Sequence, residues 1–154
     1  MSSSQLLLLV VVALALYGVG QVWLVQVSSY RLWRLVGNED FAADHAAWWR
    51  SIWIVILVPA AFVTIGAFLM PWRLAPGVPA WSAWLGCGLQ AIVVLGTAAW
   101  WGPLMARLET PSGTLSLERY ELLMRTHWVR VALITAYGAL AVWMLAVSAF
   151  GKLA

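Results

Sequence analysis

Residues 131–150 read VALITAYGALAVWMLAVSAF, a run of twenty residues without a charged side chain. A helix needs about 20 apolar residues to cross the hydrocarbon core of a bilayer. The composition agrees, because 64% of the chain is hydrophobic and only 10% is charged, against roughly 25% charged residues in soluble domains. This stretch therefore predicts a transmembrane helix, and the composition indicates that much of the remaining chain is also embedded in lipid.

Three further apolar runs have the same character. They lie at about residues 6–27, 51–70 and 80–102. Pro71 and Pro103 are expected to end the second and third spans, and Pro59 should kink the second span and free a backbone carbonyl. Because lipid offers no hydrogen bonds, the spans must pair their polar groups with one another. We expect an all-α membrane protein in which residues 1–154 form a single domain, a bundle of four transmembrane helices in the lipid bilayer.

The distribution of basic residues predicts the orientation of these spans. The connections after the first and third spans, with their helix edges, hold seven arginines: Arg31, Arg34, Arg50, Arg107, Arg119, Arg125 and Arg130. The opposite side holds only Arg73 and Lys152. The positive-inside rule makes the arginine-rich connections cytoplasmic and both termini periplasmic in a bacterial inner membrane. It also explains the net charge of +3 without a nucleic-acid partner.

Tryptophan is unusually frequent, with twelve residues in the chain. Most of them fall near the predicted membrane boundaries, where indole rings favour the headgroup level. Two aromatic belts account for this tryptophan-rich composition, and a tryptophan-lined ligand pocket is the alternative.

The second and fourth spans share a plan. Each is preceded by an arginine, Arg50 or Arg130, and each arginine is preceded by tryptophan and then by a histidine, His45 or His127. This pattern predicts two helical hairpins related by a parallel pseudo-twofold repeat. Interfacial patterning alone is the alternative, since any helix that starts at the cytoplasmic boundary favours arginine and tryptophan there.

Helical spacing places both histidines on the inner faces of their helices. These helices are expected to begin in the cytoplasm, at about residues 39 and 117. His127 shares a face with Tyr120 and with small residues suited to close packing, and His45 shares a face with apolar residues of the second span. The apolar runs themselves hold no carboxylate, lysine or histidine, which argues against an ion-coupled pump.

Two inward histidines at similar depth suggest a cofactor site in the bundle. The predicted cofactor ligands, for a haem or a transition metal, are His45 and His127, with Asp44 as a further metal ligand. The predicted pocket lining is Trp48, Trp49 and Tyr120. The alternative is that both histidines are buried, hydrogen-bonded within the bundle and without chemistry.

Two short segments are similar to known proteins. HAAWWR at residues 45–50, and ERY at 118–120 followed by HWVR at 127–130, resemble small bacterial four-helix membrane proteins of unknown function. The overall plan resembles the anthrone-oxygenase-like group, which implies an oxygenase-like pocket for a flat, lipophilic substrate. The leading hypothesis is a small membrane oxidoreductase that acts on a lipophilic small molecule or binds haem or metal. The alternative is a non-catalytic structural or accessory subunit of a homo-oligomer or a larger membrane complex. A third interpretation is a carrier for a hydrophobic molecule.

Overall fold

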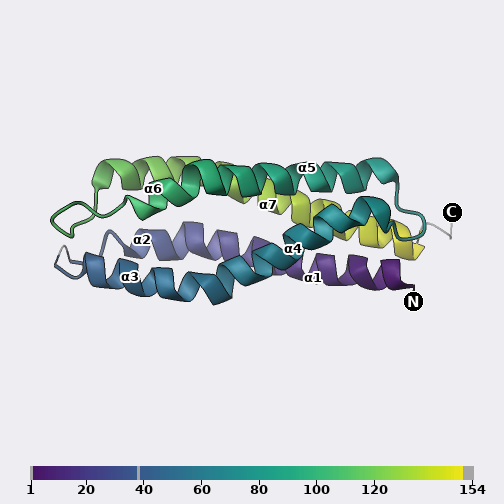
Figure 1. Ribbon diagram of the computed structural model, residues 1–154, viewed down its shortest axis with the longest axis horizontal. Helices are drawn as coiled ribbons and strands as arrows, with labels where there is room; N and C mark the ends of the chain where they lie inside the picture. The colour runs from purple at the N-terminus through teal and green to yellow at the C-terminus, as the bar shows by residue number, and fades with distance from the viewer. Residues whose placement is uncertain (1, 38, 151–154) are drawn as a thin grey trace.

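The computed structural model describes residues 2–37 and 39–150, and within these residues it contains four long helices (Figure 1). They run over Ser3–Leu32, Phe41–Trp72, Ala80–Ala106 and Leu117–Phe150. Each is long and apolar enough to cross a membrane. The predicted all-α four-helix membrane bundle is therefore confirmed for the described residues. Lys152, which was counted in the prediction of orientation, lies outside these residues.

Each of the first three long helices is interrupted by a π-helical turn. The first consists of α1 (Ser3–Leu24), the π turn η1 (Val25–Ser29) and α2 (Tyr30–Leu32). The second consists of α3 (Phe41–Ile52), the π turn η2 (Trp53–Leu57), α4 (Val58–Leu69) and a 3₁₀ turn, η3 (Met70–Trp72). The third consists of α5 (Ala80–Gly96), the π turn η4 (Thr97–Trp101) and α6 (Gly102–Ala106). The fourth, α7 (Leu117–Phe150), is continuous, so it differs from the second helix, to which the predicted repeat would relate it.

Two of the π turns lie directly before prolines. η2 ends two residues before Pro59, and η4 ends two residues before Pro103. A proline within a helix has no N–H to donate, and its ring collides with the carbonyl four residues earlier. A π turn is wider than an α-helical turn and accommodates this mismatch. The prediction that Pro103 ends the third span is therefore corrected, because α6 continues through it to Ala106.

The carbonyl that Pro59 frees is used to join two helices. The oxygen of Val55, four residues before this proline, accepts a hydrogen bond of 2.9 Å from the Tyr17 hydroxyl and a second one from the side-chain amide of Gln21. Both donors belong to α1. A backbone group that lipid could not satisfy thus becomes a polar link between the first and second helices.

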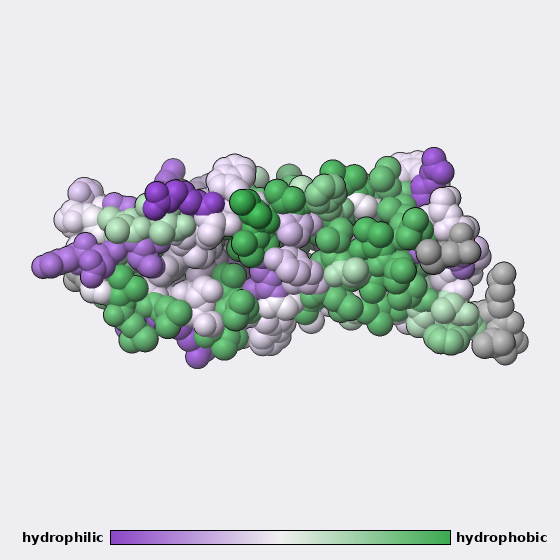
Figure 2. Space-filling view, turned by 90° about the horizontal axis from the view of Figure 1, so that it is seen from below, coloured by the Kyte–Doolittle hydropathy of each residue, from purple (hydrophilic) through white to green (hydrophobic). Residues whose placement is uncertain are grey.

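The long helices form a closed ring in which chain neighbours are also spatial neighbours. α1 packs against α4 and α7, and α5 packs against the same two helices. The start of α1 and the end of α7 lie at one end of the bundle, and the α2–α3 and α6–α7 connections lie at the other (Figure 1). Figure 2 shows hydrophilic side chains gathered mostly at the end with these two connections, and a broad hydrophobic band toward the opposite end.

Small residues allow the closest helix contacts. A Cβ atom placed on Gly138 of α7 would lie 2.6 Å from Cγ2 of Val19, and one placed on Gly66 of α4 would lie 2.5 Å from Cγ2 of Val11. Both valines belong to α1. The inward stripe of small residues on the fourth helix therefore faces the first helix and lets the two backbones approach closely.

Replacement of Gly138 by alanine is expected to lower the free energy of unfolding by about 1–3 kcal/mol, the usual cost of overpacking. Val19 is β-branched and has one strongly preferred rotamer in a helix, so it moves aside poorly. The measurement is unfolding in mixed micelles. Gly88→Ala is the matched control, because a Cβ at that position meets nothing within 4 Å. Equal effects at the two positions would contradict the close contact.

Candidate functional site

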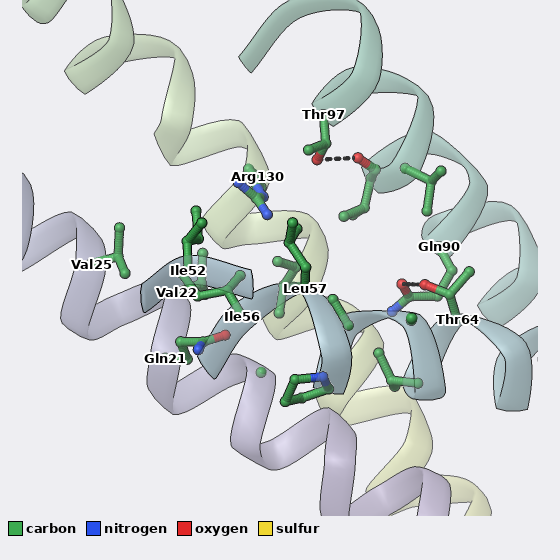
Figure 3. Close-up of a pocket in the computed structure, with 18 of the residues that line it drawn as sticks. Gln21, Val22, Val25, Ile52, Ile56, Leu57, Thr64, Gln90, Thr97 and Arg130 are labelled. Carbon is green, nitrogen blue, oxygen red and sulfur yellow. Dashed lines mark hydrogen bonds between the residues drawn. The ribbon is translucent and has the colours of Figure 1, made fainter. Parts of the chain in front are cut away.

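A cavity of about 490 Å³ lies inside the bundle, and each long helix contributes side chains to its lining. Figure 3 shows Gln21, Val22, Val25, Ile52, Ile56, Leu57, Thr64, Gln90, Thr97 and Arg130 around it. Most of the lining is apolar. Sites for small molecules have volumes of roughly 300–1,000 Å³ and the same character, mainly apolar walls with a few polar groups.

The π turns shape this cavity. Val25 of η1, Ile56 and Leu57 of η2, and Thr97 and Ala98 of η4 all belong to the lining. Because a π turn widens the helix and redirects its side chains, such turns occur frequently at functional sites. Pro59 and Pro103 were the sequence signals for two of them, whereas the turn in the first helix has no proline to mark it.

His127 contributes a fixed imidazole to the lining. Its Nδ1 lies 2.8 Å from Oε1 of Gln26, and the side-chain amide of Gln26 donates to the Met124 carbonyl at 3.1 Å. Since the amide nitrogen of Gln26 is the donor in the second bond, its oxygen is the acceptor in the first, and the imidazole carries its proton on Nδ1. Nε2 then has a lone pair and no hydrogen-bond partner among the described residues. It is the group that His127 can offer to a ligand.

Aromatic rings connect His127 to the rest of this end of the bundle. Tyr30 packs edge-on against His127 with ring centroids 5.0 Å apart, and it stacks on Trp33 at 5.0 Å. Trp33 in turn packs edge-on against His45 at 5.6 Å and against Trp48 at 5.2 Å. The two histidines are therefore linked through Tyr30 and Trp33, and the structure does not bring them to a common space.

His45 is held differently. Its Nε2 accepts a hydrogen bond of 3.1 Å from the Trp49 indole, and its Nδ1 faces the Glu109 carboxylate, 3.8 Å from Oε2. The ring also stacks on Phe41 at 5.3 Å. Both nitrogens thus face protein groups, and His45 is not part of the cavity lining. To bind a metal through Nε2, it would have to give up its bond to Trp49.

Of the other predicted site residues, one lines the cavity, two pack elsewhere in the bundle and one is exposed. Trp48 lines the cavity. Trp49 does not line the cavity, and its indole donates a hydrogen bond to His45. Tyr120 is also absent from the lining. It is buried, and the Cζ atom of Arg34 lies 5.8 Å from the centroid of its ring. Asp44 is exposed. Among the described residues, no three His, Cys, Asp or Glu side chains gather where they could hold a metal ion. The arrangement therefore does not favour a metal or haem shared by His45 and His127.

Arg130 is a candidate functional residue that was not predicted from the sequence. In the sequence, Arg130 served only to predict the orientation of the fourth span. In the structure, its side chain enters the cavity from α7 (Figure 3). Its Nε is buried and without a hydrogen-bond partner in the described part of the chain. A signal was present in its spacing from His127, because residues three apart share a helix face.

Comparisons with known proteins do not add to this assignment. No family model, no curated protein and no solved structure matches the chain.

Proposed function

We propose that this multi-pass membrane protein binds a lipophilic small molecule in the cavity between its helices. The observation that carries the proposal is an intrabundle cavity of about 490 Å³ with mostly apolar walls and a polar group of Tyr30, His127 and Arg130 in its lining. This combination suits a ligand with an apolar body and one polar end. A bundle that served only packing would be expected to fill such a volume with side chains, since protein interiors are close-packed.

The cavity reaches the lipid-facing surface. Two of its lining residues, Ile65 of α4 and Val94 of α5, are 55% and 43% exposed. Both lie in segments apolar enough to be embedded in a membrane. We infer that the ligand enters sideways from the bilayer, between the second and third helices, and never has to cross water.

His127 supplies the directional contact to the ligand. Its Nε2 accepts a hydrogen bond from a ligand hydroxyl or amide, and the bond from Nδ1 to Gln26 keeps the ring oriented. The same geometry would let Nε2 act as a general base on an acidic ligand proton. An enzymatic role of the oxygenase-like kind would use His127 in this way, with Arg130 beside a developing negative charge.

The location proposed for the protein is a bacterial inner membrane. The end of the bundle with the α2–α3 and α6–α7 connections, including the adjoining helix segments, carries most of the arginines and would face the cytoplasm. The polar end of the cavity, with Tyr30, Trp48 and His127, then lies toward the cytoplasmic side.

A direct test is the binding of tritiated hexadecanol to the protein in phosphatidylcholine nanodiscs, with empty nanodiscs as background. We expect saturable binding of one hexadecanol per chain, because its hydroxyl donates to Nε2 of His127. Replacement of His127 by phenylalanine preserves a ring but removes this acceptor, and it should weaken binding about tenfold, the equivalent of one hydrogen bond.

The matched control is His45→Phe. His45 is also buried and also precedes a tryptophan and an arginine, but it does not line the cavity. Its replacement should leave hexadecanol affinity unchanged. Binding no greater than in empty nanodiscs would refute the proposal and favour a structural or accessory subunit.

A further inference from the structure

Arg130 is a cation inside the bundle that lacks a counter-charge. Its guanidinium lines the cavity, and its Nε is buried without a hydrogen-bond partner. No ion pair joins it to a carboxylate of the described residues. A charge removed from water is costly unless it is paired, and ionisable groups within membrane helices normally mark a site with a partner.

The chain does not supply that partner from its own acids. All six acidic residues are exposed and belong to the end of the bundle that carries the long connections: Glu39, Asp40, Asp44, Glu109, Glu118 and Glu121. Two of them have other partners, since Glu109 lies 3.8 Å from Nδ1 of His45 and Glu121 pairs with Arg125. None of the six lines the cavity. Among the described residues, no acid therefore balances the charge of Arg130 in the cavity.

We propose that the ligand of the cavity is a lipophilic anion, with a carboxylate or phosphate head bound by Arg130 and an apolar body in the cavity. This inference rests on the proposed function, since it assigns the chemical class of the same ligand. A guanidinium presents a planar set of donors that matches both heads in a bidentate manner. Tyr30, which lines the same cavity, offers a hydroxyl donor to the head.

The second helix provides an internal comparison. Arg50 stands in the same sequence context as Arg130, with a histidine and a tryptophan a few residues before it. Arg50 is exposed and does not line the cavity. The membrane boundary favours an arginine at both positions, but only the arginine of the fourth helix is turned inward. Boundary patterning alone therefore does not account for the cavity arginine.

The experiment compares three tritiated probes with the same chain length in phosphatidylcholine nanodiscs: hexadecanoic acid, hexadecyl phosphate and hexadecanol, at mildly alkaline pH. The wild-type protein should bind at least one of the anions about 10- to 100-fold more tightly than the alcohol, the range for a hydrogen-bonded charge. Arg130→Gln should abolish this preference, which is measured as the ratio of anion affinity to hexadecanol affinity in the same variant. Arg130→Lys keeps the positive charge and should retain part of the preference. This result would show that Arg130→Gln acts through the lost charge and not through a loss of the fold. Arg50→Gln, the matched control, should leave the preference intact.

The outcomes separate this inference from the function on which it rests. If hexadecanol and both anions bind equally and Arg130→Gln changes nothing, the cavity binds lipophiles but the inference of an anionic head is overturned. If none of the three probes binds, the proposed function itself fails. A preference for hexadecanoic acid identifies a free carboxylate as the head, and a preference for hexadecyl phosphate identifies a phosphate such as a lipid headgroup. Either preference, when lost in Arg130→Gln, supports the inference.

Discussion

Replacement of Ala60 by tryptophan is expected to lower the affinity of the cavity for hexadecanol by on the order of 100-fold. Ala60 lines the cavity from α4, and an indole at this position would occupy space that the ligand needs. A steric conflict of this size between the indole and the ligand is expected to cost about 3 kcal/mol of binding free energy, and every 1.4 kcal/mol corresponds to a tenfold change in affinity. Equilibrium binding in nanodiscs measures the effect.

Ala99→Trp is the control for the size of the new side chain. Ala99 belongs to η4, is exposed and does not line the cavity. The same indole should leave hexadecanol affinity unchanged there. If Ala60→Trp folds, as judged by an unchanged melting temperature, and still binds hexadecanol normally, the ligand lies outside this cavity.

Replacement of Phe41 by alanine is expected to lower the free energy of unfolding by about 3–5 kcal/mol, as for a fully buried aromatic ring. Phe41 is 0% exposed and belongs to a cluster with Trp33, Leu108 and Tyr120. It lies ten residues before the predicted second span, in the part of the helix that we expect to project beyond the lipid into water. The full hydrophobic effect therefore acts on it. Unfolding by SDS in mixed micelles measures the change.

Phe62 is the matched residue in the same long helix. It is 60% exposed, and it lies within an apolar segment long enough to be embedded in lipid. Acyl chains replace the contacts of a lost ring there, because lipid is as apolar as the side chain itself. Phe62→Ala should cost less than about 1 kcal/mol. Similar losses at both positions would show that the Phe41 end does not behave as a water-exposed core.

Several features of the candidate site were accessible from the sequence. Helical spacing predicted that His127 points into the bundle, and it is buried against Gln26. Pro59 predicted a freed carbonyl, and Val55 accepts hydrogen bonds from the first helix. These predictions succeeded because they depend on properties of one helix, namely its period and the missing N–H of proline.

The structure does not favour the predicted cofactor site shared by His45 and His127, because the two side chains do not face a common space. The pattern of a single helix could not reveal this. Spacing places a side chain on a face, but it does not say which partner occupies the space in front of it. Trp49 takes the Nε2 of His45, and the rings of Tyr30 and Trp33 link His45 to His127. The pairing of two inward faces depends on how the helices are rotated against each other, and that rotation is a property of the packed bundle.

The sequence by itself determined the fold class, the number of long apolar helices and the inward direction of His127, because transfer into lipid and helical period act on local stretches of the chain. The tertiary structure decided that Arg130 faces a cavity while Arg50 stays exposed, and that three π turns shape that cavity. Both outcomes depend on contacts between residues far apart in the chain. Local physics can place an arginine at a helix boundary, but only the arrangement of the neighbouring helices determines whether its side chain faces the surface or a cavity between the helices.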